Sequence, residues 1–211
     1  MSGNSEQIEF WRGEFGNHYL ERNTADATNI RPRLQLWSQI LSRLAGRPPE
    51  SILEIGANIG INLRTLSLLT GAELWAVEPN DKARARLVED GVVPQDRAFG
   101  GSGADVTLPD ASIDLVFTSG VLIHIHPDDL LANCSQMHRV SKRYIGCVEY
   151  FSDKPVELKY REHSNKLFKR DFGGFWMDNF PDLQLIDYGF AWKRVTGLDN
   201  LTWWIFEKRG E

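Results

Sequence analysis

Long hydrophobic runs are absent from this chain of 211 residues. No stretch of about 18 apolar residues occurs, and the sequence therefore predicts no membrane-spanning helix. Residues 1–16 are polar and charged and lack the apolar core of a secretory signal peptide. Together these absences predict a cytoplasmic protein that does not bind a membrane.

Cysteine and an excess of basic residues are also lacking. Cys134 and Cys147 are the two cysteines of the chain, and each lies in an apolar stretch without CxxC spacing or a His/Cys cluster. They are expected to be reduced thiols in the core, and no metal site is predicted. The formal net charge is -5, which gives no electrostatic footprint for nucleic acid.

What the sequence does contain is an alternation of short apolar runs and helical patterns, with 42% hydrophobic and 25% charged residues. This balance and the chain length predict one globular domain over residues 1–211. The strands are expected at 51–56, 72–79, 112–119 and 144–150, and the helices at 61–71, 81–91 and 127–141. Such an order favours a parallel sheet with helices on both faces.

Both ends of the chain depart from this alternation. Residues 183–195 and 200–209 have strand patterns, and too few residues separate them for a helical crossover. They are expected to pair antiparallel. Residues 1–45 are aromatic and helical and predict an amino-terminal cap, whereas residues 150–180 predict an insert on the substrate side.

The stretch "LEIGANIGIN" (53–62) marks the first turn between a strand and a helix. Ligands of open α/β sheets bind at the carboxyl ends of the strands, and Gly56 and Gly60 let the backbone approach one. Asn58 replaces the second glycine of a dinucleotide fingerprint, and no Gly-Lys-Ser/Thr follows as in a phosphate loop. Glu54 at the strand end suits a cationic amine better than a phosphate.

A second acid, Glu78 in "AVEPN", ends the next strand 22 residues after Gly56. An acid at this point can accept both hydroxyls of a ribose. An amine near the first turn and a ribose at the second strand describe S-adenosylmethionine. The alternative is a glycine-rich turn with an incidental surface glutamate.

Several blocks resemble known families. "LEIGANIG", "VEPN" and "SIDLVFTSGVLIHIHPDDL" resemble motifs of class I S-adenosylmethionine-dependent methyltransferases. Over nearly the whole chain, the sequence is also similar to the pseudaminic acid biosynthesis-associated methylase family, named for its gene context with nonulosonic sugar pathways. The similar blocks are "FWRGEFGNHYLERN" (10–23), "GVLIHIHPDDL" (120–130), "VEYFSDKPVELKYREH" (148–163) and "LFKRDFGG" (167–174).

The resemblance implies an α/β, Rossmann-like class I methyltransferase fold. Its sheet would be mostly parallel and seven-stranded, with an antiparallel hairpin at the carboxyl end. It also implies S-adenosylmethionine as cofactor. Gly56, Asn58 and Gly60 would form the loop under the methionine part, and Glu54 would lie by its amine.

The adenosine contacts implied by the resemblance lie on the following loops. Glu78 would hold the ribose, and Pro79 and Asn80 would flank the adenine. Many class I enzymes carry an acid after the third strand to bind the adenine amine. Here that place holds Ala104, with Asp105 next to it, so backbone groups near Ala104 or Asp105 itself would serve.

The sulfonium and carboxylate of the cofactor have further candidates. Ser119 and Gly120 end the fourth strand and would lie beside the sulfonium. Tyr19, Arg22 and Asn23 are spaced to share a helix face. Arg22 is a candidate partner of the cofactor carboxylate, and the alternative is a solvated surface arginine.

An oxygen or nitrogen acceptor benefits from a base that removes its proton. His124 and Glu149, which follow the fourth strand and end the fifth, are the candidate catalytic residues. A base at His124 predicts a rate that rises between about pH 6 and 7. The alternative for His124 is a hydrogen bond that shapes its turn, and His126 is expected to cap a helix. Glu149 follows mainly apolar residues and needs a partner or a ligand.

Cations interleaved with aromatics mark the predicted insert. On a surface helix such charges would face solvent, but the aromatics indicate a buried side, so some cations are expected to line a pocket. Arginine can hold a carboxylate in two hydrogen bonds, which suits an acidic sugar or a nucleotide-linked sugar. The candidate substrate-binding residues are Tyr150, Arg161, Lys169 and Arg170.

The sequence therefore predicts a methyltransferase that acts on an oxygen or nitrogen of a small molecule. The acceptor would be a sugar or nucleotide sugar of a nonulosonic acid pathway, or a natural product, and the protein a monomer or homodimer. Two alternatives stay open: a non-catalytic regulatory module that binds S-adenosylmethionine, and a nucleotide-cofactor oxidoreductase.

Overall fold

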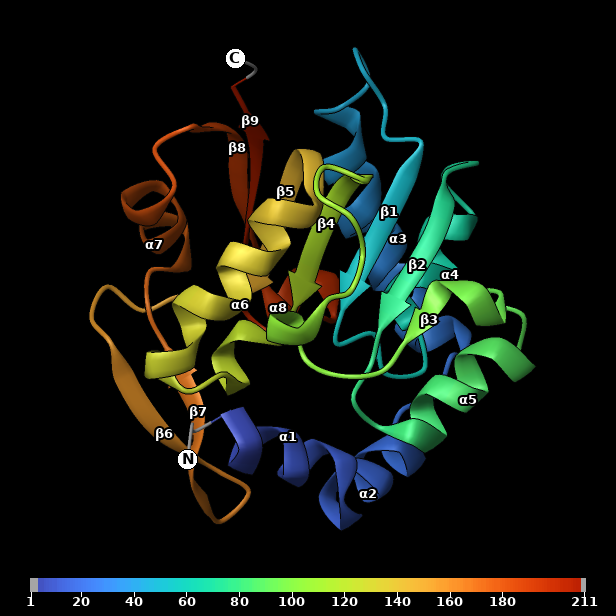
Figure 1. The fold of residues 1–211 in the computed structure, drawn as a ribbon, viewed down its shortest axis with the longest axis vertical. Helices are drawn as coiled ribbons and strands as arrows, with labels where there is room; N and C mark the ends of the chain where they lie inside the picture. Colours follow the sequence, from blue (N-terminus) through green and yellow to red (C-terminus); the bar gives the residue numbers. More distant parts are fainter. Residues whose placement is uncertain (1–3, 210–211) are drawn as a thin grey trace.

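A seven-stranded sheet forms the centre of the protein in the computed structural model, which describes residues 4–209 (Figure 1). Its strands are β1 (Ser51–Ile55), β2 (Glu73–Val77), β3 (Ala98–Phe99), β4 (Ile113–Ser119), β5 (Ser141–Glu149), β8 (Leu183–Ala191) and β9 (Leu201–Lys208). Their order is β3-β2-β1-β4-β5-β9-β8, and β9 pairs antiparallel with both neighbours. This arrangement confirms the predicted fold class.

Helices cover both faces of the sheet, as Figure 1 shows with α3 behind it and α6 in front. They are α3 (Ala27–Ser42), α4 (Ile61–Ser67), α5 (Asp81–Glu89), α6 (Pro127–Val140) and α7 (Phe172–Asn179), and a short α8 (Lys193–Thr196) follows β8. One core layer holds Trp37 of α3 and Leu63 of α4, and the other holds Met137 of α6 and Trp176 of α7. Burial on both faces explains why the parallel strands are almost continuously apolar.

The two cysteines lie in the second of these layers. Cys134 of α6 and Cys147 of β5 are fully buried and free, as the sequence predicted. Residues 183–195 were expected to be one strand, but β8 ends at Ala191 and α8 begins at Lys193.

Helix starts near the carboxyl ends of the strands are fixed by local groups. Asn80 caps α5 by accepting a hydrogen bond from the Ala83 amide at 3.0 Å. Pro127 occupies the first turn of α6, where its missing N–H is not needed. Gly60 before α4 has φ 72°, and a Cβ there would lie 2.6 Å from Leu87 Cδ2. Gly60 is therefore required by both its backbone conformation and its packing.

Two further elements lie at the carboxyl ends of the parallel strands, at the bottom of Figure 1. They are the helix pair α1 (Asn4–Arg12) and α2 (Glu14–Arg22), and the hairpin of β6 (Val156–Tyr160) and β7 (His163–Lys169). Here these two elements are called the roof. The helix pair lies within residues 1–45, the segment predicted to form an amino-terminal cap.

The charged run of the insert lies on a strand and not on a surface helix. Its residues form β7, which pairs Leu167 with Leu158 and Phe168 with Glu157 of β6. In a strand, neighbouring side chains point to opposite faces, so charged and apolar residues can alternate without a helical stripe.

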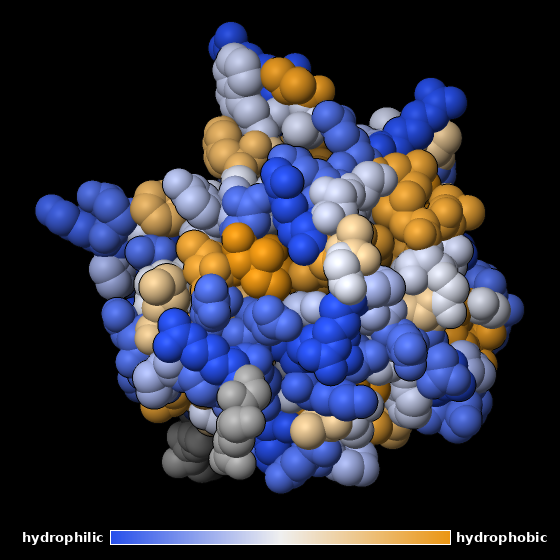
Figure 2. Space-filling model, turned by 90° about the horizontal axis from the view of Figure 1, so that it is seen from above, coloured by the Kyte–Doolittle hydropathy of each residue, from blue (hydrophilic) through white to orange (hydrophobic). Residues whose placement is uncertain are grey.

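The opposite end of the molecule, where the parallel strands begin, is seen in Figure 2. Hydrophilic residues dominate this face and are interrupted by separate hydrophobic patches. Within residues 4–209, no helix is both long enough and apolar enough to cross a bilayer.

Candidate active site

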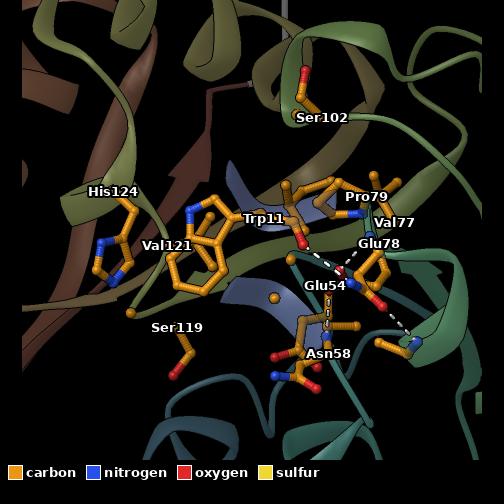
Figure 3. Close-up of a pocket in the computed structure, with 18 of the residues that line it drawn as sticks. Trp11, Glu54, Asn58, Val77, Glu78, Pro79, Ser102, Ser119, Val121 and His124 are labelled. Atoms are coloured by element: carbon orange, nitrogen blue, oxygen red, sulfur yellow. Dashed lines mark hydrogen bonds between the residues drawn. The ribbon is translucent and has the colours of Figure 1, made fainter. Parts of the chain in front are cut away.

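A cavity of about 180 Å³ lies at the carboxyl ends of β1, β2 and β4, under α1 and α2. The strand order reverses between β1 and β4, and such a switch point is where open α/β sheets bind ligands. Loops after all three strands line the cavity, together with residues 101–103, α3 and the first turns of α6. Figure 3 shows the side chains that project into it.

The loop after β1 is shaped by left-handed residues. Gly56 has φ 73°, and a Cβ there would lie 2.6 Å from Val121 Cγ2, so the turn needs glycine. Asn58 also has a positive φ, of 50°, and its amide donates to Glu78 Oε2 at 2.6 Å. The side-chain oxygen of Asn58 is buried without a hydrogen-bond partner among the described residues. Both residues line the cavity as predicted.

Glu54 lies at the bottom of the cavity and is 2% exposed. Its Oε1 accepts from Asn62 Nδ2 at 2.7 Å, whereas its buried Oε2 has no partner among the described residues. Burial raises the pKa of Glu54 to about 8, against the opposing effects of Asn62 and the charge of Arg33. A buried acceptor without a partner indicates room for a ligand donor.

Glu78 directly follows β2 and is 6% exposed. Its two oxygens accept from the backbone amides of Asn80 at 2.8 Å and Asn58 at 2.6 Å, which ties two ligand-facing loops together (Figure 3). Burial raises the pKa of Glu78 to about 7. Each oxygen keeps a second lone pair for a ligand hydroxyl.

His124 lines the cavity on the β4 side, where Trp11 of α1 packs against it with ring centroids 4.9 Å apart. Its Nδ1 lies 2.6 Å from the carbonyl oxygen of Lys166, and a carbonyl only accepts. In the neutral ring Nδ1 therefore carries the hydrogen, and Nε2 has a free lone pair. Burial lowers the pKa of His124 to about 4.

Glu149, the other predicted catalytic residue, does not line the cavity. Its Oε1 accepts from the amides of Val121 and Leu122, each at 3.1 Å, and Oε2 lies 3.5 Å from the Ile123 amide. Burial raises the pKa of this carboxyl to about 7. Glu149 thus lies behind the turn that carries His124, so the expected contact with substrate is not found.

The predicted adenine contact at Ala104 is also displaced, because Gly101, Ser102 and Gly103 line the cavity there instead. The carboxylate of Asp105 accepts from Ser102 Oγ at 2.7 Å and from the Ser102 amide at 3.3 Å. This capping interaction draws the acid back onto its own loop.

The amino-terminal candidates divide in the same way. Tyr19 lines the cavity, but Arg22 is exposed and lies 5.7 Å from the rings of Phe15 and Tyr19. Arg33 of α3, which the sequence reasoning missed, lines the cavity instead. The missed signal is helical spacing, since Arg33 stands three and seven residues before the buried Leu36 and Ile40.

The remaining cofactor candidates differ in how they meet the cavity. The predicted cofactor-binding residues Pro79, Asn80, Ser119 and Gly120 line it, whereas Gly60 supports the loop from behind. Asn80 has an additional role, because its Nδ2 donates to the Trp11 carbonyl at 3.1 Å and so joins α5 to the roof.

None of the four predicted substrate-binding residues lines this cavity. Tyr150 and Lys169 line a second cavity, where Tyr150 Oη donates to Asp199 Oδ2 at 2.7 Å. Arg161 is exposed at the hairpin turn, and Arg170 packs over the ring of Phe175 at 5.2 Å. The pairing of the hairpin directs these cations away from the cavity, and their positions in the sequence do not reveal that pairing.

Comparison with known proteins addresses the family. Residues 53–144 match the family model described as a methyltransferase domain. No curated protein matches the sequence. The more specific resemblance to pseudaminic acid-associated methylases stays a prediction.

Solved structures share the fold at low identity. An S-adenosylmethionine-dependent methyltransferase from Leishmania major has a TM-score of 0.74 at 18% identity, over 96% of this chain and 82% of its own. The 1,6-didemethyltoxoflavin N1-methyltransferase of Burkholderia thailandensis, solved with that compound and S-adenosylhomocysteine, has a TM-score of 0.71 at 18% identity, over 100% and 92%. Magnesium protoporphyrin IX methyltransferase from Synechocystis, with bound S-adenosylmethionine, scores 0.65 at 12% identity, over 99% and 98%. Residues 53–144 thus match a methyltransferase domain, and the fold of the chain is that of solved S-adenosylmethionine-dependent methyltransferases.

Proposed function

We propose that this protein transfers a methyl group from S-adenosylmethionine to an oxygen or nitrogen of a small molecule. The observation that carries the proposal is the polar layout of the cavity. An unpartnered carboxylate oxygen of Glu54 faces the charge of Arg33 at the β1 end, and Glu78 lies at the β2 end. The methyltransferase domain and the shared fold support it.

The residues at the β1 end fit the amino-acid part of this cofactor. Glu54 can accept hydrogen bonds from an ammonium group, and the half-buried Arg33 can pair with a carboxylate. The two ends of a zwitterion would therefore pair with Glu54 and Arg33, which are poorly solvated when the cavity holds no ligand.

The residues at the β2 end fit a nucleoside. The free lone pairs of Glu78 can accept from two ribose hydroxyls, and Pro79 and Val77 offer apolar contacts to a base. Asn58 contributes the orphaned side-chain oxygen noted above. The polar and apolar groups that line the cavity therefore suit each part of the predicted cofactor.

When bound, S-adenosylmethionine supplies an electrophilic methyl group on a sulfonium. The chain contributes alignment, exclusion of water and a proton acceptor. Ser119 and Gly120 line the cavity between its two ends, and Trp11 and Tyr19 cover it from the roof. His124 would accept the proton of an acceptor hydroxyl or amine at Nε2, because the Lys166 carbonyl keeps Nδ1 protonated.

Two similarities bear on the acceptor. The neighbour from Burkholderia thailandensis holds a small heterocyclic molecule, which favours a small acceptor here too. The four blocks similar to pseudaminic acid-associated methylases favour a nonulosonic sugar or its nucleotide derivative. Tyr150 and Lys169 stay candidates for the far end of such a molecule, and both line a second cavity.

Calorimetry with S-adenosylhomocysteine and NAD tests the cofactor. S-adenosylhomocysteine is expected to bind and NAD is not, and the reverse order would contradict the proposal in favour of an oxidoreductase. Glu78→Ala should weaken binding by about 1.5–3 kcal/mol, the range for a hydrogen bond to a charged group. Glu73→Ala is the matched control, because Glu73 is exposed at the other end of β2.

Mass spectrometry of candidate acceptors tests the transfer itself. Incubation with S-adenosylmethionine and a panel of acidic sugars and nucleotide sugars should add one methyl group to a member of the panel. Tight cofactor binding without transfer to any hydroxyl or amine acceptor would favour the regulatory module instead.

A further inference from the structure

Asp129 in the first turn of α6 lines the cavity and has no role in the function proposed above. Its Oδ2 is buried and has no hydrogen-bond partner among the described residues. Leaving a carboxylate oxygen buried and unpaired is unfavourable, so its presence indicates a donor that the chain itself does not supply.

The surroundings of Asp129 place it at the adenine end of the cavity. Asn133, one turn further along α6, donates from Nδ2 to the Asp129 carbonyl at 2.9 Å. A Cβ on Gly103 would lie 2.8 Å from Asn133 Oδ1, so α6 contacts the loop after β3 directly. Asp129 therefore adjoins the loop in which an acid for the adenine amine was expected.

That loop supplies no free carboxylate. Ala104 has no polar side chain, and the Asp105 carboxylate is held by the amide and hydroxyl of Ser102. Within residues 4–209, three carboxylate residues line the cavity, and Glu54 and Glu78 have positions suited to the amine and the ribose. Asp129 is therefore the remaining carboxylate that can contact the adenine.

We infer that Asp129 accepts a hydrogen bond from the exocyclic amine of the cofactor's adenine, in place of an acid after the third strand. The inference rests on the proposed function, because it requires S-adenosylmethionine in this cavity. It makes Asp129 a specificity residue that selects a purine with a donor at position 6.

A double-mutant cycle separates this contact from packing. The two ligands are S-adenosylhomocysteine and its 6-desamino analogue, in which hydrogen replaces the adenine amine. The proteins are the wild type, Asp129→Ala, and Asp128→Ala as control, since Asp128 is exposed and does not line the cavity. Calorimetry gives each dissociation constant, and thermal melting reports folding.

Asp129→Ala is expected to lower the affinity for S-adenosylhomocysteine about 10- to 100-fold. The affinity for the analogue should stay unchanged within about twofold. Asp129→Asn keeps an acceptor oxygen and should lose less. Because the native carboxylate is unpaired, neither change should lower the melting temperature of the ligand-free protein.

Equal loss of both ligands in Asp129→Ala would overturn the inference, since the residue would then only support packing. Unchanged affinity for S-adenosylhomocysteine would overturn it as well, while the proposed function would stand. A wild-type protein that binds neither ligand would instead reject the proposed function on which the inference rests.

Discussion

Three buried glutamates lie in or directly after strands of the sheet, and their surroundings give them different roles. Glu54 and Glu78 keep oxygen lone pairs that face the cavity, whereas the oxygens of Glu149 are occupied by the turn after β4. A strand-end acid in an apolar run marks all three in the sequence. Which of them meets a ligand depends on the neighbouring loop, which local sequence patterns do not give.

Glu149→Gln tests this division. The amide keeps one acceptor oxygen but can place its N–H₂ against the Ile123 amide, so one hydrogen bond is replaced by a repulsive contact. We expect the free energy of unfolding to fall by about 1 kcal/mol, measured by urea denaturation. S-adenosylhomocysteine affinity should barely change. Wild-type stability together with a large loss of turnover would contradict the structural role and restore a catalytic one.

His124 requires a correction to its expected pH dependence. A pKa of about 4, caused by burial, keeps the imidazole neutral throughout the physiological range. The rise in rate between about pH 6 and 7 expected of an ordinary histidine is therefore no longer predicted.

His124→Asn should lower the rate of transfer to a hydroxyl acceptor by about 10²–10⁴, the usual contribution of a general base. The loss should be uniform from pH 6 to pH 8, because the wild-type ring stays deprotonated there. Initial rates of methyl transfer measure it, with His126→Asn as control, since His126 caps α6. Equal rates in His124→Asn and wild type would show that alignment alone suffices.

At the scale of elements, the roof is held by contacts between segments far apart in the chain. Lys166 of β7 is 6% exposed and pairs with Glu6 of α1 at 2.8 Å, and its carbonyl orients His124. Gln7 of α1 donates to the Asn165 carbonyl at 2.6 Å. These contacts join the two halves of the roof to each other and to the β4 side of the cavity.

Lys166→Met should loosen the roof and leave the sheet intact. Methionine fills the space of the buried stem but removes the ion pair, while the backbone carbonyl that orients His124 remains. We expect S-adenosylhomocysteine to dissociate several-fold faster, as measured by stopped-flow fluorescence of the tryptophans. Lys159→Met is the control on the same hairpin, because Lys159 is exposed. Identical dissociation rates in the two variants would show that the ion pair of Lys166 does not hold the roof closed.

The helical half of the roof could be predicted from the sequence and the hairpin half could not. Aromatic residues in 1–45 accompany a clear helical pattern, whereas the run from Arg161 to Arg170 mixes charges and aromatics without a decisive period. Pairing with β6 decides its conformation, and pairing across a turn is not visible in one strand alone. The same limit explains why Arg161 and Arg170 were assigned to substrate.

At the scale of the whole molecule, the sheet was the most predictable part. Short apolar runs separated by capped helices specify parallel strands, and the short link before residues 200–209 requires an antiparallel neighbour. The two-residue β3 has too few side chains to form a pattern. The loop after it was consequently placed one to three residues too far along, at Ala104 instead of 101–103.

The buried acids predict how overall stability depends on pH. Glu54, with a pKa of about 8, and Glu78 and Glu149, each with a pKa of about 7, hold protons in the folded state that the unfolded chain releases near 4.5. Their contribution to stability is complete below about pH 4.5 and is lost as the pH rises to 8. His124, whose folded pKa is lowered to about 4, acts oppositely below its ordinary value of 6.5.

The ligand-free protein should therefore lose stability between pH 6.5 and pH 8. In this interval the three glutamates titrate and His124 does not. Urea denaturation at several pH values measures the slope. Saturating S-adenosylhomocysteine should reduce it, because an ammonium group beside Glu54 favours the carboxylate. A stability that rises over this interval would contradict the proton uptake assigned to these acids.

Asn80 contacts both the cavity and its cover, and this double attachment bears on the timing of turnover. Its amide donates to the acid at the ribose end, while its side chain binds the backbone of α1. Exchange of a nucleoside through this side would break the contact between Asn80 and the helix pair. If the protein transfers methyl groups as proposed, we therefore expect the methyl donor to bind before the acceptor and the spent nucleoside to leave last.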